Sequence, residues 1–392
     1  MPPARDETTI GETRLDALLR RDADRSVPVS FEDLEAAARD HLAGDVFDYV
    51  AGGAGAEHTV SGNQRAFDDW RIRPAMLRGV SEVDLGVNLL DTDSPVPLWL
   101  SPIGAQTIVH EKGEVATASA AGDLGVPMMV SSVSSKSLEA VAESGGDAPC
   151  WFQLYPCADD SVTESFIRRA EVAGYEAIVV TVDTPAYAWR ERDLSNGFHP
   201  QVAGHRPANY FEDPAFRAGL DSTPEADLDA AYDRFHDLFS NPDLDWDAVG
   251  DIAESTDLPV LLKGILRADD ARRAVECGAD GIIVSNHGGR QVDRAIASLD
   301  ALPEVVNEVG DEVPVLLDGG VRRGSEAFVA LALGADAVCL GRPYVYGLEV
   351  AGADGVADVL ANVLTDLLST LAQSGHGSVT GIERNDVTEI QH

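Results

Sequence analysis

The sequence contains very little lysine. Lys112, Lys136 and Lys263 are its only lysines, and the other 26 of its 29 basic residues are arginine. Acidic residues number 67 and are spread along the chain, so the formal net charge is −38. Because a polyanion repels nucleic acid and anionic membranes, we expect neither as a partner. Dispersed acid with scarce lysine predicts a halophilic protein that stays hydrated in concentrated salt; an acidic protein of a mesophile is the alternative.

Signals for secretion, membrane insertion and metal binding are also lacking. The first 22 residues contain no apolar core of a signal peptide, and no apolar run approaches the length of a membrane span. The four cysteines, Cys150, Cys157, Cys277 and Cys339, form no CxxC pair. Free thiols in a reducing compartment are therefore expected. We predict a soluble cytoplasmic protein, and we predict no metal site.

Eight short apolar runs follow one another from residue 96 onward. Most begin 22 to 32 residues after the previous one, the length of a strand plus a helix. Strands that are apolar on both faces and joined by crossover helices form a parallel sheet. The count of eight, and the lack of GxGxxG after the first run, favour a (β/α)8 TIM barrel over a doubly wound open sheet. The runs are VPLWLS (96–101), VPMMVSS (126–132), CWFQLY (150–155), AIVVTVD (177–183), PVLLKG (259–264), GIIVSN (281–286), VPVLLDG (313–319) and AVCLGR (337–342).

The rest of the chain is arranged around this predicted barrel. Residues 1–25 are charged and poorly patterned, which predicts a flexible arm. SFEDLEAAARDHL (30–42) predicts a serine-capped helix in an N-terminal helical extension. We expect residues 26–380 to form a single domain, with residues 381–392 as a C-terminal tail.

One connection is much longer than the others. The fourth and fifth runs begin 82 residues apart, and the excess lies at about 191–245. It follows a strand, so in a barrel it lies on the face where active sites form. Long insertions on that face are commonly lids over the site. An acidic solvated excursion, or a contact within an oligomer, are the alternatives.

Polar residues and glycines stand at the end of every run. In a TIM barrel the chemistry is carried by the C-terminal ends of the strands, so these residues are the candidate site. They are Pro102, Ile103, Gly104, Ser131, Gln153, Tyr155, Thr181, Asp183, Arg190, Lys263, Ser285, His287, Arg290, Asp318, Gly319, Gly320, Arg322, Gly341 and Arg342.

The stretch VSNHGGRQVD (284–293) contains the clearest catalytic candidates. His287 takes up a proton near neutral pH, and the planar fork of Arg290 suits a carboxylate. The two glycines between them let the backbone turn so that both side chains face one substrate. Asp183, two strands away, is placed to orient the imidazole and stabilise its protonated form.

The other strand ends predict a flavin with a phosphate. DGGVRRG (318–324) and GRP (341–343) are glycine-rich turns with arginines, on the two strands where barrels commonly bind phosphate. Lys263 ends a strand in a chain that avoids lysine, and a fixed cation suits a flavin ring that becomes anionic. A proton acceptor, a carboxylate clamp, an electron sink and a phosphate site together predict oxidation at the carbon beside a carboxylate.

The motif SNHGGRQ closely resembles the signature of the FMN-dependent L-2-hydroxy acid oxidases. That family includes glycolate oxidase, lactate oxidase, lactate 2-monooxygenase and mandelate dehydrogenase. The resemblance extends in order from FDYVAGGAGAE (47–57) through FQLY, TVDTP, LLKGI and DGGVRRG to GRPYVYG. It implies an oxidoreductase with FMN, which uses a 2-hydroxy acid and oxygen and forms a homotetramer or octamer.

The resemblance also implies a role for each site residue. His287 looks like the catalytic base with Asp183 as its partner, and Arg190 and Arg290 look like the carboxylate clamp. Tyr49 and Tyr155 look like the hydroxyls that contact the substrate. The flavin-ring and ribityl contacts are implied for Pro102, Ile103, Gly104, Ser131, Gln153, Thr181, Lys263 and Ser285. The ribityl and phosphate end is implied for Asp318, Gly319, Gly320, Arg322, Gly341 and Arg342.

Two features resemble the lactate 2-monooxygenase branch. Gly104 stands where oxidases of the family usually have alanine, and the missing methyl implies more room beside the flavin. The 191–245 insertion also resembles that branch. Val133 stands where glycolate oxidase has tryptophan, which implies room for a methyl or larger side chain. We expect L-lactate and oxygen to give a 2-oxo acid with peroxide, or acetate.

Three other readings stay open at this point. A dehydrogenase of the same fold would pass electrons to a quinone or a carrier. A non-redox FMN isomerase would have no carboxylate for Arg190 and Arg290 to hold. An inactive binding protein would not need every group named above.

Overall fold

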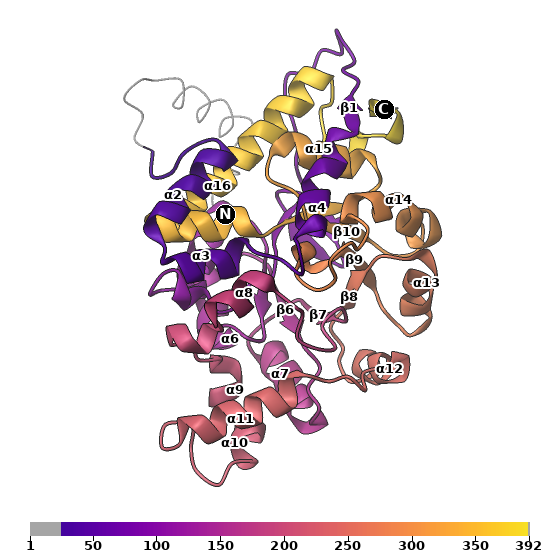
Figure 1. Ribbon diagram of the computed structural model, residues 1–392. Coiled ribbons are helices and arrows are strands. Elements are labelled where there is room, and N and C mark those ends of the chain that lie inside the picture. Colours follow the sequence, from indigo (N-terminus) through magenta and orange to yellow (C-terminus); the bar gives the residue numbers. More distant parts are fainter. Residues whose placement is uncertain (1–24, 391–392) are drawn as a thin grey trace.

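Eight parallel strands form a closed barrel at the centre of the protein (Figure 1). The computed structural model describes residues 25–390. The strands are hydrogen-bonded in the order β10, β11, β4, β5, β6, β7, β8, β9, so the last strand lies beside the first. The predicted TIM barrel is confirmed, and each strand falls on one of the eight runs. The strands are β4 (Leu98–Leu100), β5 (Met128–Ser131), β6 (Cys150–Leu154), β7 (Ala177–Thr181), β8 (Val260–Ile265), β9 (Gly281–Ser285), β10 (Val315–Asp318) and β11 (Ala337–Leu340).

Large apolar side chains fill one end of the barrel. Trp99 and Trp151 are fully buried there, with ring centroids 5.3 Å apart. Leu89 joins this cluster from the hairpin of β2 (Val87–Leu89) and β3 (Thr92–Ser94), which precedes the first barrel strand. The polar residues therefore lie at the opposite, C-terminal ends of the strands. The parallel register sets Thr181 beside Lys263 and Ser285 beside Asp318.

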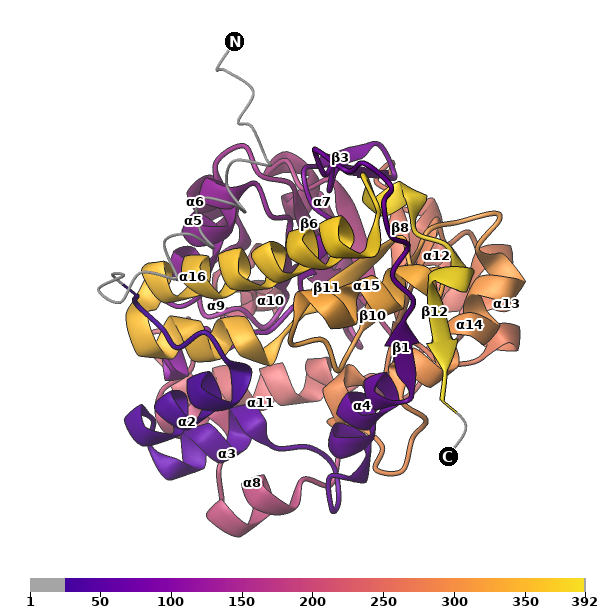
Figure 2. The same cartoon turned by 90° about the horizontal axis from the view of Figure 1, so that it is seen from above.

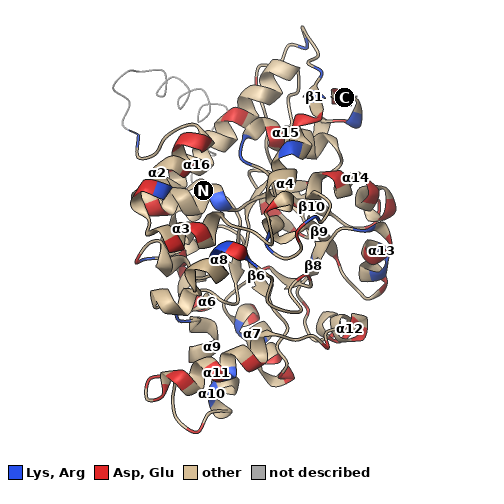
Figure 3. Ribbon diagram, viewed as in Figure 1, with Lys and Arg blue, Asp and Glu red and all other residues tan. Residues whose placement is uncertain are grey.

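Helices cover the outside of the barrel (Figure 2). Each comes after a barrel strand in the chain and buries an apolar face, as the alternating pattern predicts. Acidic residues are distributed over the outer helices, including α12, α13 and α14 (Figure 3). These helices are α5 (Glu114–Leu124), α6 (Leu138–Gly145), α7 (Asp160–Val172), α12 (Trp246–Glu254), α13 (Ala268–Glu276), α14 (Ser298–Val309), α15 (Gly324–Ala332) and α16 (Arg342–Ser374).

Three helices form the predicted N-terminal extension. They are α2 (Phe31–His41), α3 (Gly44–Ala51) and α4 (His58–Asp68). Ser30 caps α2, because its hydroxyl accepts a hydrogen bond from the backbone N–H of Asp33. The extension matters for the site because the end of α3 carries Tyr49 to the open end of the barrel. The predicted arm at 1–25 lies outside the described residues except for its last residue.

Helix α16 is the longest helix in the described part of the chain. It is long and apolar enough to cross a membrane by length and composition, with a mean hydropathy of 1.3 over 18 residues. It packs against α5, α15 and α2. The backbone kinks at Ala351 and Gly352, where Gly352 has a φ of 61°. These contacts are those of a core helix, since Val356, Leu360 and Leu367 are buried within the protein.

The long insertion folds into short helices that pack on the barrel. They are α8 (Glu191–Asn196), α9 (Ala208–Glu212), α10 (Pro214–Ala218) and α11 (Leu228–Phe239). Tyr210 and Phe216 are fully buried, and Asp213 caps α10 through the N–H groups of Ala215 and Phe216. The insertion is therefore an ordered part of the domain. At the other end of the chain, the predicted tail forms β12 (Val387–Glu389), which pairs with β1 (Trp70–Ile72).

Candidate active site

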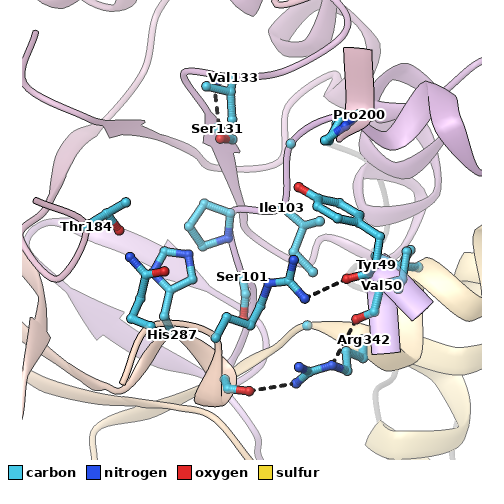
Figure 4. A pocket seen from close by; sticks show the side chains of 18 of the residues that line it. Tyr49, Val50, Ser101, Ile103, Ser131, Val133, Thr184, Pro200, His287 and Arg342 are labelled. Carbon is cyan, nitrogen blue, oxygen red and sulfur yellow. Dashed lines mark hydrogen bonds between the residues drawn. The ribbon is translucent and has the colours of Figure 1, made fainter. Parts of the chain in front are cut away.

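A cavity of about 430 Å³ opens at the C-terminal ends of the strands. Its size is within the range of small-molecule sites. Tyr49 and Arg342 border it from α3 and α16, and His287 borders it from the loop after β9 (Figure 4). The predicted site residues that line it are Tyr49, Pro102, Ile103, Gly104, Ser131, Tyr155, Arg190, Lys263, His287, Arg290, Asp318, Gly319, Gly320, Arg322, Gly341 and Arg342.

The remaining predicted residues lie behind this wall. Gln153 is fully buried and joins two strand ends, since it accepts from Ser131 Oγ and donates to Thr181 Oγ1, both at 3.0 Å. Ser285 and Asp183 likewise contact wall residues. These four, Gln153, Thr181, Asp183 and Ser285, do not line the cavity, and the flavin contacts implied for Gln153, Thr181 and Ser285 stay a prediction. The sequence correctly placed them at or near strand ends, but it did not indicate that they lie behind the residues of the cavity wall.

His287 and Asp183 form the central pair of the site. His287 Nδ1 lies 2.8 Å from Asp183 Oδ1, so the carboxylate accepts the Nδ1 proton and Nε2 is left as the acceptor. The loop that positions the imidazole ring has a left-handed backbone conformation, with φ of 59° at His287 and 62° at Gly288. Tyr155 Oη lies 3.5 Å from Nε2. The group that takes a proton from a substrate is thus His287 Nε2, beside a tyrosine hydroxyl.

Burial and charge set the protonation of this pair. Burial lowers the pKa of His287 below its usual range, and Asp183 opposes that effect. Burial acts to raise the pKa of Asp183, but His287 and Lys263 outweigh it and hold that pKa below its usual value. Burial and the charge of Asp183 raise the pKa of Tyr155 to about 12. At neutral pH the site therefore holds a neutral imidazole, a carboxylate and a protonated tyrosine.

A buried pair of asparagines anchors the histidine loop. Asn63 Nδ2 donates to Asn286 Oδ1 at 2.8 Å, and Asn286 Nδ2 donates to Asn63 Oδ1 at 2.7 Å. Asn286 Oδ1 also accepts from the N–H of Gly289. The pair ties the loop of His287 to α4. Sequence reasoning missed Asn63, because no local pattern distinguishes it from any other helix residue 223 positions away.

Two arginines meet at the substrate end of the cavity. Arg290 Nη1 donates to the carbonyls of Tyr49 at 2.6 Å and Gly52 at 2.9 Å, and its guanidinium lies over the Tyr49 ring at 4.9 Å. Arg190 Nε donates to the Arg290 carbonyl at 3.1 Å. Burial and the neighbouring charge of Arg190 lower the pKa of Arg290 to about 10. The two adjacent, partly buried cations favour an anionic ligand, as the sequence predicted.

An ion pair forms the floor of the cavity. Lys263 Nζ lies 2.9 Å from Asp318 Oδ2 and donates to Ser285 Oγ at 3.0 Å. Asp318 also accepts from Ser101 Oγ at 2.7 Å. Burial acts to raise the pKa of Asp318, but Lys263 and the two hydroxyls hold it at about 2. The sequence predicted both charged residues in the site, but neither their pairing nor the role of Ser101.

The opposite end of the cavity suits a phosphate. Gly319 and Gly320 have φ of 115° and 94°, and a Cβ at Gly320 would lie 2.4 Å from the Asn63 carbonyl. Within the described residues the buried Nε of Arg322 has no partner. Arg342 instead donates to three carbonyls, those of Val50, Gly288 and Gly52. Arg322 is therefore the cation with an unused donor for a phosphate, and Arg342 mainly ties α3 to the barrel.

The space beside Gly104 is occupied by another loop. A Cβ at Gly104 would lie 2.7 Å from both Cγ2 and the carbonyl oxygen of Val133. The predicted extra room beside the flavin was therefore wrong, because the residues after β5 already fill it. Glu114 holds this arrangement, since its buried carboxylate accepts from the N–H groups of Gln106 at 3.0 Å and Ser135 at 2.9 Å. Sequence reasoning missed Glu114.

The insertion supplies part of the cavity wall. His199, Pro200, His205, Phe235 and Phe239 line it. This placement agrees with the position of the insertion after the fourth barrel strand. Its movement as a lid stays a prediction. Sequence reasoning did not find these wall residues. They are not at the ends of barrel strands, and strand-end position was the criterion that identified the other site residues.

Comparisons with known proteins agree with this geometry. The model of the family described as FMN-dependent dehydrogenase matches residues 38–389. An L-lactate oxidase of Lysinibacillus sphaericus is 43% identical over 93% of this chain and 95% of its own length. A 4-hydroxymandelate oxidase of Amycolatopsis orientalis is 40% identical over 91% of this chain and 97% of its own. A solved mandelate oxidase with (S)-4-hydroxymandelic acid is 39% identical, with a TM-score of 0.83 over 92% of this chain and 98% of its own.

Proposed function

The chain belongs to the FMN-dependent dehydrogenase family, and from that premise we propose that it oxidises L-lactate with oxygen as the acceptor. It is an oxidoreductase of the 2-hydroxy acid oxidase type that uses FMN. The observation that carries the proposal is the meeting of His287 Nε2 with the Arg190 and Arg290 pair in one cavity. A proton acceptor beside a carboxylate clamp matches an acid with a hydroxyl on the adjacent carbon.

The residues present fit the cofactor. The unpartnered Nε of Arg322 and the backbone of Gly319 and Gly320 would hold the phosphate. Lys263, buried beside Ser285, would supply positive charge at the ring. When bound, FMN accepts two electrons from the substrate.

The substrate's own groups are then assigned to protein atoms. Arg290 and Arg190 bind the carboxylate, which balances the charge of two partly buried cations and fixes the acid in one orientation. Tyr155 stays protonated and donates to a substrate oxygen, since its pKa is raised to about 12. His287 Nε2 takes up the proton that the substrate loses, and Asp183 stabilises the imidazolium that results. A hydride route and a carbanion route both need this acceptor.

The substrate and the acceptor are proposed from the relatives. The L-lactate oxidase relative supports lactate, and Val133 leaves the side-chain end of the cavity wider than a large aromatic residue would. Products are pyruvate with peroxide, or acetate, carbon dioxide and water if the peroxide oxidatively decarboxylates pyruvate before either leaves the site. The filled space beside Gly104 favours the first outcome, because it removes the extra room on which the second was based.

The test is reduction of the bound flavin in the absence of air. L-lactate is mixed with the FMN-loaded protein, and loss of the flavin absorbance is followed; air is then admitted, and pyruvate, peroxide and acetate are quantified. We expect rapid bleaching, rapid reoxidation, and pyruvate with peroxide. Slow reoxidation by oxygen with fast reoxidation by a quinone would identify a dehydrogenase. No bleaching with any hydroxy acid would exclude the proposal.

A matched pair of histidine variants tests the assigned base. His287→Gln removes the acceptor in the cavity, and we expect FMN to stay bound while bleaching by L-lactate is almost lost. His41→Gln changes an exposed histidine at the end of α2 and serves as the control. Equal rates in the two variants would remove His287 from the chemistry.

We also propose that the protein is a homotetramer or octamer in a salt-rich cytoplasm. The composition supports the salt preference, because dispersed carboxylates hold water and cations at high salt. Light scattering and thermal unfolding in dilute and in multimolar potassium chloride test both statements. A monomer, or a Tm that falls as salt rises, would contradict them.

A further inference from the structure

Aromatic rings form a chamber where the insertion meets the barrel. The ring of Phe239 lies 5.0 Å from that of Tyr155, 5.8 Å from that of Tyr187 and 5.4 Å from that of Phe235. All four residues line the cavity. The chamber adjoins the proposed substrate site, because Tyr155 also contacts His287. Such a wall suits a flat apolar group larger than a methyl.

His205 places a hydrogen-bonding ring nitrogen in the same wall. It lines the cavity, and only 5% of its surface is exposed. Its Nδ1 lies 3.2 Å from Ser135 Oγ, and that hydroxyl already accepts from the N–H of Thr107. The Ser135 hydroxyl is the hydrogen-bond partner of Nδ1, so Nε2 is the ring nitrogen of His205 that is left for a ligand. Within residues 25–390 no hydrogen bond to that Nε2 is formed.

His199 is a second neutral imidazole that lines the same cavity. Its ring lies 6.2 Å from that of Tyr187. Burial lowers the pKa of His199 to about 4, and His236 and Arg190 add to the effect. Burial also lowers the pKa of His205 to about 4, with a contribution from His199. Within the described residues the buried Nδ1 of His199 has no hydrogen-bond partner, and both imidazoles are uncharged at neutral pH.

We propose that His199 and His205 form a distal subsite for a neutral hydroxyl on the substrate's side chain, so that hydroxylated aromatic 2-hydroxy acids are substrates in addition to lactate. This inference rests on the proposed function. A hydroxyl both donates and accepts, so it can bond the ring nitrogen of a neutral imidazole in either tautomer. The aromatic chamber holds the ring that carries it. A second carboxylate is disfavoured there, because neutral imidazoles do not balance its charge.

The test compares substrates that differ by one hydroxyl. L-3-(4-hydroxyphenyl)lactate and L-3-phenyllactate are used with the FMN-loaded protein, and kcat/KM is measured for each. One buried hydrogen bond predicts a preference of roughly twofold to tenfold for the hydroxylated acid. His205→Phe keeps an aromatic ring without a hydrogen-bonding nitrogen and should abolish the preference. His205→Gln places an amide near the position of Nε2 and should retain part of it. His41→Phe, outside the cavity, should leave the ratio unchanged.

Binding of inert analogues separates this inference from the proposed function. Phenylacetate and 4-hydroxyphenylacetate are titrated against the change they cause in flavin absorbance, which needs no turnover. Tighter binding of the hydroxylated analogue, lost in His205→Phe, supports the subsite even if no hydroxy acid reduces the flavin. Equal affinities and equal kcat/KM values in the wild-type protein overturn the subsite, even if L-lactate is oxidised rapidly. A preference that survives His205→Phe also overturns it.

Discussion

Replacing Asp183 by asparagine separates the charge of the catalytic pair from its geometry. Asparagine has the same shape, and its side-chain oxygen still accepts the Nδ1 proton of His287 across the 2.8 Å contact. The negative charge is lost. Lys263 and Arg190 both act against a proton on His287, and Asp183 is the group that opposes them. The imidazolium formed during the reaction therefore loses its main stabilising partner.

The size of the effect follows from the distance. An opposite charge in contact shifts a pKa by about one to three, which is about 1.4 to 4 kcal/mol. The contact is partly buried, with the His287 and Asp183 side chains 19% and 13% exposed, so water screens it only in part. If the proton is largely transferred in the transition state, flavin reduction slows by about 10-fold to 1,000-fold. Substrate affinity should change much less, because the arginine clamp is untouched.

The assay is anaerobic stopped-flow bleaching of the flavin by L-lactate as a function of pH. The neutral imidazole is the active form, so the rate falls as the pH drops through the pKa of His287, which lies below its usual value. Loss of Asp183 lowers that pKa further, so the acid limb moves to lower pH while the plateau falls. Asp247→Asn, at an exposed position in α12, is the control. An unchanged plateau, or a limb that moves to higher pH, would refute this reasoning.

Three further variants test other parts of the site. Lys263→Met leaves the Asp318 carboxylate buried without its cation, so the free energy of unfolding in urea should fall by about 3 kcal/mol, whereas the exposed Lys112→Met should have little effect. Arg290→Lys loses the planar fork, so KM for L-lactate should rise at least about 10-fold; an unchanged KM would exclude Arg290 from the clamp. Gly104→Ala brings a methyl within 2.7 Å of Val133, so the rate of flavin reduction should fall and thermal stability should drop by about 1 to 3 kcal/mol; wild-type values would show that the loop shifts freely.

The fold and most of the cavity wall were predictable for a simple reason. Apolar runs such as AIVVTVD identify buried parallel strands, and their spacing of a strand plus a helix implies a closed barrel. Closure brings all C-terminal strand ends to one face. Any polar residue at a strand end is then a site candidate, which is how Lys263, His287 and Asp318 were found.

The hydrogen-bond partners of the site residues, and whether a residue lines the cavity or lies behind its wall, were not predictable in the same way. Asn63 bonds Asn286, Lys263 bonds Asp318, and His205 bonds Ser135, and each pair joins separate elements of the barrel or its insertions. Periodicity describes one element at a time, so it gives no distance between side chains on different elements. The error at Gly104 has the same origin. The missing methyl group can be read from the sequence, but the packing of the Val133 loop into that space cannot.

The sequence by itself determined the barrel, its open face and the chemical character of that face. Those follow from hydrophobic period, strand count and residue type, which are properties of the chain read in order. Tertiary structure alone decided which polar groups reach the cavity, which are neutralised by a neighbour, and how large a side chain the insertion admits. Those depend on register, on side-chain direction and on close packing between segments far apart in the chain, where a difference of an ångström changes the outcome.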